Sequence, residues 1–237
     1  MNKKQHYRTV FISDIHLWNP KNQWDKLIKF LNLIDFENLI IVWDFIDFWK
    51  LRRFWKRWEK EKETLNYINN LAKSWIKITY IQWNHDRKLK YSEKIKIENM
   101  TICKEMYYKT LKWKIYYITH WDSISWNSEK LSDFIWQLWN LIFWCLSKLE
   151  KLWNKKSSLT EKLENYIKKM IVPDHKIKKK IENFTKNLTC DWIIIWHFHI
   201  AEHYEVNWID YFCTWDRIKN CSAVIEDLKW NLELIKI

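Results

Sequence analysis

Carboxylate, amide and imidazole side chains recur along this chain in short groups that could bind metal ions. Asp14 is followed two residues later by His16, and His197 is followed two residues later by His199. In an extended segment, residues i and i+2 point to the same side, so each pair can aim at one centre. This mixed oxygen and nitrogen donor set suits two borderline cations such as Mn²⁺, Fe²⁺ or Zn²⁺ better than Ca²⁺. Three more donors complete the set: Asp44, Asn84 and His120.

The donors follow short apolar runs that predict β-strands. Apolar residues with helical spacing over residues 22–34, Ile34 included, and over residues 59–72 alternate with these runs, which predicts an α/β sheet. Sites in such sheets form at the carboxyl ends of strands, so we expect five strand ends to bring polar side chains to one edge. The five predicted strands are residues 7–12, 39–42, 76–81, 115–119 and 193–195. Predicted hairpin strands follow at residues 203–206, 209–214, 223–227 and 232–237.

The chain contains no glycine and 20 tryptophans. Ordinary usage, roughly 7% Gly, would give about 17 glycines in a chain of this length. Trp208, in Asn207-Trp208, lies between two strand-like runs, where a two-residue hairpin favours Gly because the turn needs φ > 0. Trp113 and Trp230 also lie between strand-like runs. We therefore hypothesise that most of these tryptophans are glycines in the natural protein, as when a UGA codon read as Gly by the source is translated as Trp.

Five motifs emerge when the Trp positions are read as Gly. In this order they resemble the motif set of the calcineurin-like metallophosphoesterases, over about residues 8–227. The resemblance implies an α/β fold, the four-layer αββα metallophosphoesterase sandwich, as a single domain over residues 1–237 with a helical lid insertion at residues 124–190. The motifs are Ser-Asp-Ile-His at 13–16, Gly-Asp at 43–44, Gly-Asn-His-Asp at 83–86, His-Gly-Asp at 120–122 and Gly-His-Phe-His at 196–199.

The same resemblance implies two divalent metal ions, with Mn²⁺ as the first choice and Fe²⁺, Zn²⁺ or Mg²⁺ as alternatives. Asp44 resembles the carboxylate that bridges both metals. The implied reaction is hydrolysis of a phosphodiester or pyrophosphate bond by a metal-activated hydroxide. The other implied ligands are Asp14, His16 and His199 for one metal, and Asn84, His120 and His197 for the second.

His85 and Asp86 are the implied catalytic residues. His85 resembles the histidine that contacts a phosphate oxygen or protonates the leaving group. Asp86 and Asp47 resemble groups that orient histidine side chains.

Within the family, the chain is most similar to UDP-2,3-diacylglucosamine hydrolase-like proteins. Its size, its helical insertion and the stretch from Asp44 to Trp49, followed by Leu51-Arg52-Arg53, carry this likeness, and they make Trp49 the best candidate for a genuine Trp. Some members of that group have Arg where this chain has His85. Two alternatives stay open: the same chemistry on a cyclic nucleotide, a nucleotide or a phosphoprotein, or a non-catalytic scaffold of this fold.

The net charge and the cysteine content indicate which partners and which cellular compartment to expect. The formal net charge is +12, and residues 148–188 carry twelve Lys against five acids. We expect an anionic phosphoester substrate, lipid-linked in the first reading, with peripheral membrane contact through the Lys-rich lid and no nucleic acid. The five Cys form no CxxC pair, and residues 1–10 lack the apolar run of a signal peptide. These features predict a cytoplasmic protein. For a lipid-linked substrate, we expect the protein to be peripheral at the inner face of the membrane.

Overall fold

Two compact units make up the chain in the computed structural model. Residues 1–122 together with residues 189–237 form the first, and residues 123–188 form the second. The structure describes residues 4–13, 15, 24–42, 45, 58–82, 99–110, 112–120, 174–186, 188–196, 202–206, 209–213, 222–229 and 231–236.

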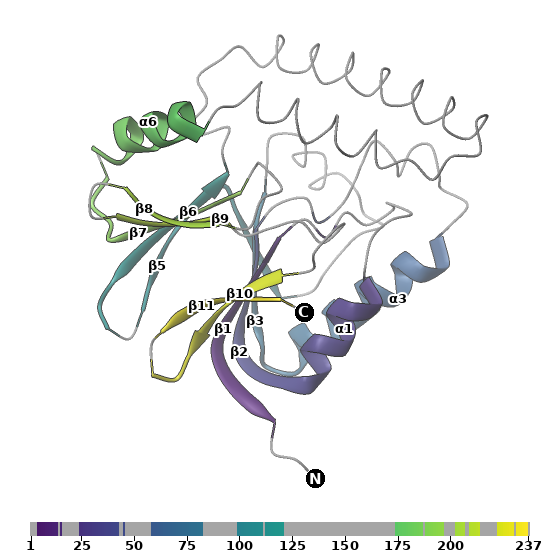
Figure 1. The fold of residues 1–237 in the computed structure, drawn as a ribbon. Coiled ribbons are helices and arrows are strands. Elements are labelled where there is room, and N and C mark those ends of the chain that lie inside the picture. Colours follow the sequence, from purple (N-terminus) through teal and green to yellow (C-terminus); the bar gives the residue numbers. More distant parts are fainter. Residues whose placement is uncertain are drawn as a thin grey trace, which may run out of the picture. The chain divides into compact units, whose positions relative to one another are not determined.

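The larger sheet of the first unit is built from the apolar runs near both ends of the chain (Figure 1). Its strands are β1 (Gln5–Ser13), β2 (Ile34–Val42), β3 (Lys77–Ile81), β4 (Met100–Cys103), β10 (Ser222–Asp227) and β11 (Leu232–Lys236). Among the described residues the order is β11-β10-β1-β2-β3-β4. Strands β1 to β4 run parallel, whereas β10 is antiparallel to both β1 and β11.

A second, smaller sheet takes the remaining strands. These are β5 (Met106–Lys109), β6 (Ile115–His120), β7 (Trp192–Trp196), β8 (Glu202–Val206) and β9 (Ile209–Cys213). In the part of the chain that the structure describes, their order is β5-β6-β7-β9-β8. Strands β6, β7 and β9 are parallel, and β5 and β8 pair antiparallel at the two edges. The five strand ends expected at one edge are thus divided between two sheets, three and two, because hydrophobic periodicity does not determine which strands pair.

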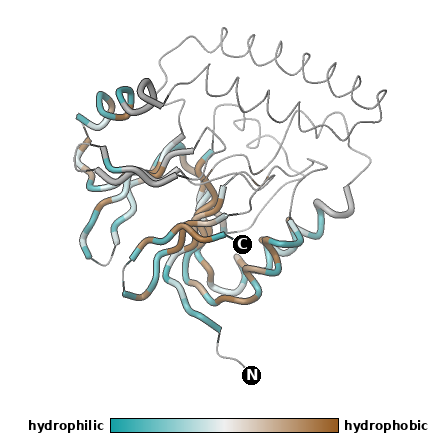
Figure 2. Tube along the Cα trace, in the orientation of Figure 1, coloured by the Kyte–Doolittle hydropathy of each residue, from teal (hydrophilic) through white to brown (hydrophobic). Residues whose placement is uncertain are grey.

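Helices α1 (Trp24–Leu33) and α3 (Trp58–Lys73) cover one face of the larger sheet. Leu27 and Leu31 of α1 and Ile68 of α3 are buried in a core that includes Val10, Ile12, Leu39 and Ile41 of the sheet. Figure 2 shows hydrophobic residues concentrated along the strands of this sheet, while hydrophobic and hydrophilic residues alternate along the helices. The predicted helix over residues 22–34 is one residue too long, because Ile34 begins β2 and pairs with Gln5 of β1.

A second apolar layer lies between the two sheets. It contains Phe11, Ile40, Val42, Ile81 and Val224 from the larger sheet and Tyr108, Tyr116, Ile118 and Ile194 from the smaller one. The neighbouring residues Thr119 and Ile193 are also fully buried. Since successive residues of a strand point to opposite faces, β6 and β7 are buried on both sides, as parallel strands of an α/β fold usually are.

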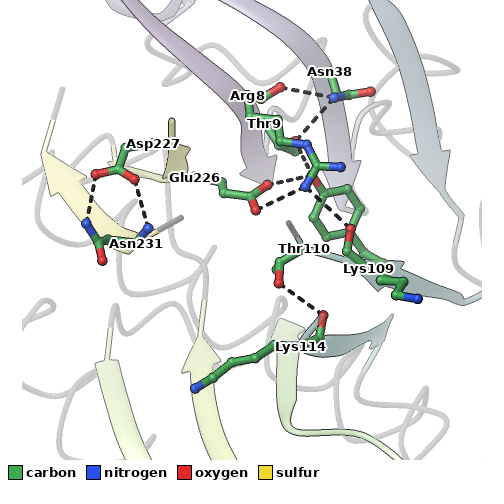
Figure 3. A network of polar contacts seen from close by, with 10 residues as sticks. Arg8, Thr9, Asn38, Lys109, Thr110, Lys114, Glu226, Asp227 and Asn231 are labelled. Carbon is green, nitrogen blue, oxygen red and sulfur yellow. Dashed lines mark hydrogen bonds and ion pairs between the residues drawn. The ribbon is translucent and has the colours of Figure 1, made fainter. Parts of the chain in front are cut away.

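A polar network also joins the two sheets (Figure 3). The carboxylate of Glu226 on β10 is fully buried and accepts hydrogen bonds from the Tyr108 hydroxyl at 2.5 Å and from the Arg8 guanidinium at 3.3 Å. The hydroxyls of Thr9 and Tyr108 are hydrogen-bonded to each other. Asn38 of β2 donates to the Arg8 carbonyl at 3.0 Å. Burial, followed by the hydrogen bond to Glu226, raises the pKa of Tyr108 well above its usual value, so this phenol stays a donor at neutral pH.

Two tryptophans occupy the left-handed region of the backbone. Trp75, with φ of 72°, follows the last turn of α3, where Ser74 donates its backbone N–H to the carbonyl of Asn70 at 3.1 Å. Gly is the commonest residue at this position after a helix, because it has no Cβ to clash. Trp113, with φ of 67°, closes the turn between β5 and β6, where its N–H donates to the Thr110 carbonyl at 3.1 Å. Trp75 is 98% exposed and Trp113 is 76% exposed, so little burial compensates their strain.

The second unit contributes helix α6 (Asp174–Thr185) to the described residues, with Ile181 and Thr185 buried. Residues 128–173, where further helices are predicted, lie outside the described residues. The assignment of residues 124–190 as a lid stays a prediction.

The polar network predicts a specific loss of stability in Tyr108→Phe. The variant keeps the buried ring but removes the hydroxyl that donates to the Glu226 carboxylate, so the free energy of unfolding should fall by roughly 2 kcal/mol. Urea denaturation measures this change. Tyr107→Phe is the matched control, because Tyr107 lies next to it on β5 and is 55% exposed. Equal effects of the two substitutions would show that the network adds nothing to stability.

The backbone at Trp75 predicts an unusual order of stability. Trp75→Ala and Trp75→Gly both remove the exposed ring, but only Gly also removes the Cβ that clashes at positive φ. We expect the Gly variant to be more stable than the Ala variant by about 1 kcal/mol, the reverse of the order inside a helix. Urea denaturation of both variants tests this, and an Ala variant at least as stable as the Gly variant would contradict it.

Candidate functional site

His120 is the one predicted metal ligand that the described backbone includes, and it is the last residue of β6. The other predicted ligands and catalytic residues lie outside the described residues, so their convergence stays a prediction. They are Asp14, His16, Asp44, Asn84, His85, Asp86, His197 and His199. Within the described ranges alone, no group of three or more His, Cys, Asp or Glu side chains could hold a metal ion.

Three strands of the larger sheet end level with one another beside the predicted ligands. In the parallel register, Ser13 at the end of β1 is paired with Val42 at the end of β2. Val42 is in turn paired with Ile81 at the end of β3. Asp14 is the next residue after Ser13 in the sequence, Asp44 is the second after Val42, and Asn84 is the third after Ile81. At this edge of the sheet, each of three neighbouring strands therefore ends no more than three residues before a predicted ligand.

The smaller sheet shows the same arrangement with two strands. His120 of β6 is in register with Trp196 of β7, and the two strands are parallel. His197 follows Trp196 directly in the sequence. In both sheets the predicted ligands thus follow the carboxyl ends of parallel strands, where sites in α/β proteins form.

The carboxyl edge of the larger sheet carries polar side chains that were not among the predicted ligands or catalytic residues. Ser13, Gln82 and Ser222 are 1%, 9% and 2% exposed. In the described part of the chain, the two Ser hydroxyls and the Gln82 carbonyl oxygen have no hydrogen-bond partner. A buried polar group without a partner costs roughly 1–3 kcal/mol, so such groups need an explanation. The signal for Ser13 and Gln82 was available in the sequence, because each is the first polar residue after an apolar strand.

The donor chemistry at this edge fits a pair of divalent cations. Carboxylate, amide and imidazole groups together suit Mn²⁺, Fe²⁺ or Zn²⁺. Buried hydroxyls and amide oxygens beside them can orient the groups that hold a metal. These residues fit divalent cations by the chemistry of their donor groups and by their positions in the sequence next to strand ends.

Thiol chemistry is not supported at Cys103 or Cys190. Burial, followed by the negative charge of Glu105, raises the pKa of the Cys103 thiol. Burial, followed by Asp191, raises the pKa of the Cys190 thiol. Both therefore stay protonated at neutral pH, whereas a nucleophilic cysteine needs a lowered pKa.

Another polar contact holds the smaller sheet. The Tyr117 hydroxyl on β6 donates to the Glu105 carboxylate at 2.5 Å, and burial together with this bond raises the pKa of Tyr117. The Ile115 N–H at the start of β6 donates to the Asp191 carboxylate at 2.8 Å, just before β7 begins. These contacts fix the amino-terminal half of β6 and leave its carboxyl end, with His120, for the predicted site.

Solved structures of low sequence identity are similar to this chain over nearly its full length. An archaeal phosphodiesterase is 16% identical, with a TM-score of 0.50, over 97% of this chain and 99% of its own. A Thermotoga maritima protein solved by NMR is 14% identical, with a TM-score of 0.45, over 98% of this chain and 99% of its own. Vacuolar protein sorting 29 from Cryptosporidium parvum is 9% identical, with a TM-score of 0.46, over 97% and 96%.

The likeness to the archaeal phosphodiesterase shows the fold, which is α/β with mixed sheets and helices. No family model and no curated protein sequence matches the chain. None of the helices in the described ranges is long and apolar enough to cross a membrane.

Proposed function

We propose that this chain is a metal-dependent phosphohydrolase that cleaves a phosphodiester or pyrophosphate bond. The observation that carries the proposal is the level ending of β1, β2 and β3 at Ser13, Val42 and Ile81. A donor motif begins within three residues of each of these positions, and the order of the motifs matches the metallophosphoesterases. The fold shared with an archaeal phosphodiesterase is consistent with this chemistry.

The proposed ligands divide between the two sheets. In the sequence, Asp14, Asp44 and Asn84 follow strands of the larger sheet, His120 ends β6 of the smaller sheet, and His197 comes directly after β7. Two bound divalent cations, Mn²⁺ in the first choice, would supply Lewis acidity and an activated water. Asp44 would hold both cations, and His85, oriented by Asp86, would contact a phosphate oxygen or protonate the leaving group.

A nucleotide-linked lipid similar to UDP-2,3-diacylglucosamine is the proposed substrate. Its support is the insertion at residues 124–190 and the twelve Lys of residues 148–188, which would attract an anionic substrate or membrane surface at the inner face. Cyclic nucleotides, nucleotides and phosphoproteins are the alternative substrates.

We also propose that most Trp positions, including 43, 83, 121 and 196 beside the motifs, are Gly in the natural protein. The backbone at Trp75 and Trp113 supports this proposal, since both have the positive φ that favours Gly. Beside the motifs, the absence of a Cβ would let the backbone approach the metals and the phosphate. Activity is therefore best measured on a chain with Gly at these four positions.

Hydrolysis by this four-glycine chain should depend on Mn²⁺ and on Asp44. Asp44→Ala should abolish turnover because it removes the carboxylate shared by both metals. His85→Ala should keep the metals but slow turnover by roughly 10²–10⁴-fold. The measurement is release of product from bis-p-nitrophenyl phosphate, a cyclic nucleotide and UDP-2,3-diacylglucosamine, each with and without Mn²⁺, together with metal content.

Three outcomes would change this reading. Loss of metal in His85→Ala would make His85 a ligand. Hydrolysis of the small esters alone would favour the alternative substrates over the lipid. The absence of any Mn²⁺-dependent hydrolysis would favour a non-catalytic scaffold.

The mass of the protein isolated from its natural source tests the Gly proposal directly. We expect peptides that span positions 75 and 113 to be lighter than the written sequence requires, by the difference between a Trp and a Gly side chain. Peptide mass spectrometry of the natural protein makes this measurement. Peptides with Trp at both positions would overturn the proposal.

A further inference from the structure

Ser13 ends β1 and Ser222 begins β10, on neighbouring strands at the carboxyl edge of the larger sheet. Strands β1 and β10 are antiparallel, with Phe11 paired with Val224 and Val10 paired with Ile225. Ser13 and Ser222 each lie two residues beyond the last pair of this register, Phe11 with Val224.

Both serines face the space between the two sheets. Phe11 and Val224 belong to the apolar layer between the sheets, whereas Ile12 and Ala223 belong to the core under the helices. Because side chains alternate along a strand, Ser13 lies on the same face as Phe11, and Ser222 lies on the same face as Val224. The apolar layer between the sheets thus ends, at the edge where the predicted ligands begin, in a pair of hydroxyls.

The two hydroxyls are buried, and the described residues offer them no hydrogen-bond partner. Ser13 is 1% exposed and Ser222 is 2% exposed. Neither hydroxyl oxygen has a hydrogen-bond partner among the described residues. Asp14 follows Ser13 directly in the sequence, and Val42, two residues before Asp44, is paired with Ser13 on the next strand. In the sequence, the carboxylates nearest to Ser13 and to its paired Val42 are therefore those of the predicted metal ligands Asp14 and Asp44.

We propose that Ser13 and Ser222 are positioning residues that donate hydrogen bonds to the oxygen ligands of the metal centre, the Asp14 and Asp44 carboxylates or a water between them. The inference rests on the proposed metal-dependent function and adds two residues outside the motif ligands. A ligand carboxylate held by a second hydrogen bond keeps its orientation when the metal binds, which raises metal affinity. Two buried hydroxyls that have no hydrogen-bond partner among the described residues are suited to this role.

The test compares Ser13→Ala, Ser222→Ala and the double variant with a matched control. Thr64→Val is the control, because the Thr64 hydroxyl is also buried without a partner in the described residues but lies on α3, against the opposite face of the sheet. The parent for all variants is the four-glycine chain, whose Mn²⁺ affinity is measured by calorimetry and whose metal-free stability is measured by urea denaturation. Each Ser→Ala change should weaken Mn²⁺ binding roughly 10–100-fold. The control should bind like the parent chain.

Stability without metal separates positioning from packing. Since no described residue forms a hydrogen bond with these hydroxyls, the urea midpoint of each metal-free Ser→Ala variant should be unchanged or higher, as for the control. Ser13→Thr keeps the hydroxyl and should keep the affinity, and the Co²⁺ absorption spectrum should change in Ser13→Ala but not in Ser13→Thr. Unchanged Mn²⁺ affinity in both Ser→Ala variants would overturn the positioning role alone. A parent chain that binds no Mn²⁺ would overturn the proposed function as well.

Discussion

The buried carboxylate of Glu226 constrains how the two sheets can face each other. An apolar layer such as that of Phe11, Ile118 and Ile194 is non-directional and would tolerate several alignments of the sheets. A carboxylate that is fully buried needs hydrogen-bonding or charged partners at defined positions. Glu226 has them in Arg8 of β1 and Tyr108 of β5, so strands from both sheets must meet at this point for the charge to be compensated. The network thereby selects one alignment, and the apolar layer supplies most of the free energy.

The same constraint reaches the predicted site through strand register. Thr9 is paired with Glu226 across β1 and β10, and this register continues to Phe11 and Val224, two residues from Ser13 and Ser222. A slip of one residue would move Glu226 to the other face of the sheet, away from Tyr108, and would also separate the serine pair. On the other side of β1, the parallel register with β2 and then β3 sets the level at which three strands end. The polar network at one end of β1 and the candidate metal site at its other end are therefore consequences of one set of pairings.

The sequence predicts the elements near the site well, because apolar runs that stop at a polar residue are a strong signal. All five strands predicted before ligands are present, and β1, β6 and β7 extend by a residue or two beyond the expected bounds. Strand β2 begins five residues earlier than expected, at Ile34, and β3 begins one residue later, at Lys77. Strands β4 and β5 were missed, since each has only four residues and exposed positions such as Ile102 and Tyr107. The division into two sheets was not evident from periodicity alone, because it depends on which strands pair over long sequence distances. Ser222 carries no motif and becomes visible only through its register with β1.

The three described residues with positive φ show how this chain fills left-handed positions. One is Asn99, with φ of 57°, and Asn is several-fold enriched there because its short side chain can bond to the local backbone. The other two are Trp75 and Trp113, whose bulky side chains gain almost no burial in return for the steric cost. A sequence adapted to this fold would place Asn or Gly at both positions, a helix end and a hairpin turn. The chain has no Gly at all. If Gly codons of the natural protein were translated as Trp, Trp residues with positive φ would be expected at such helix ends and hairpin turns. Beside the motifs, the reason to expect Gly is different. Trp196 ends the extended strand β7, so its backbone conformation does not require Gly. Gly would be favoured there only because a residue without a side chain leaves space for a group that approaches the backbone closely.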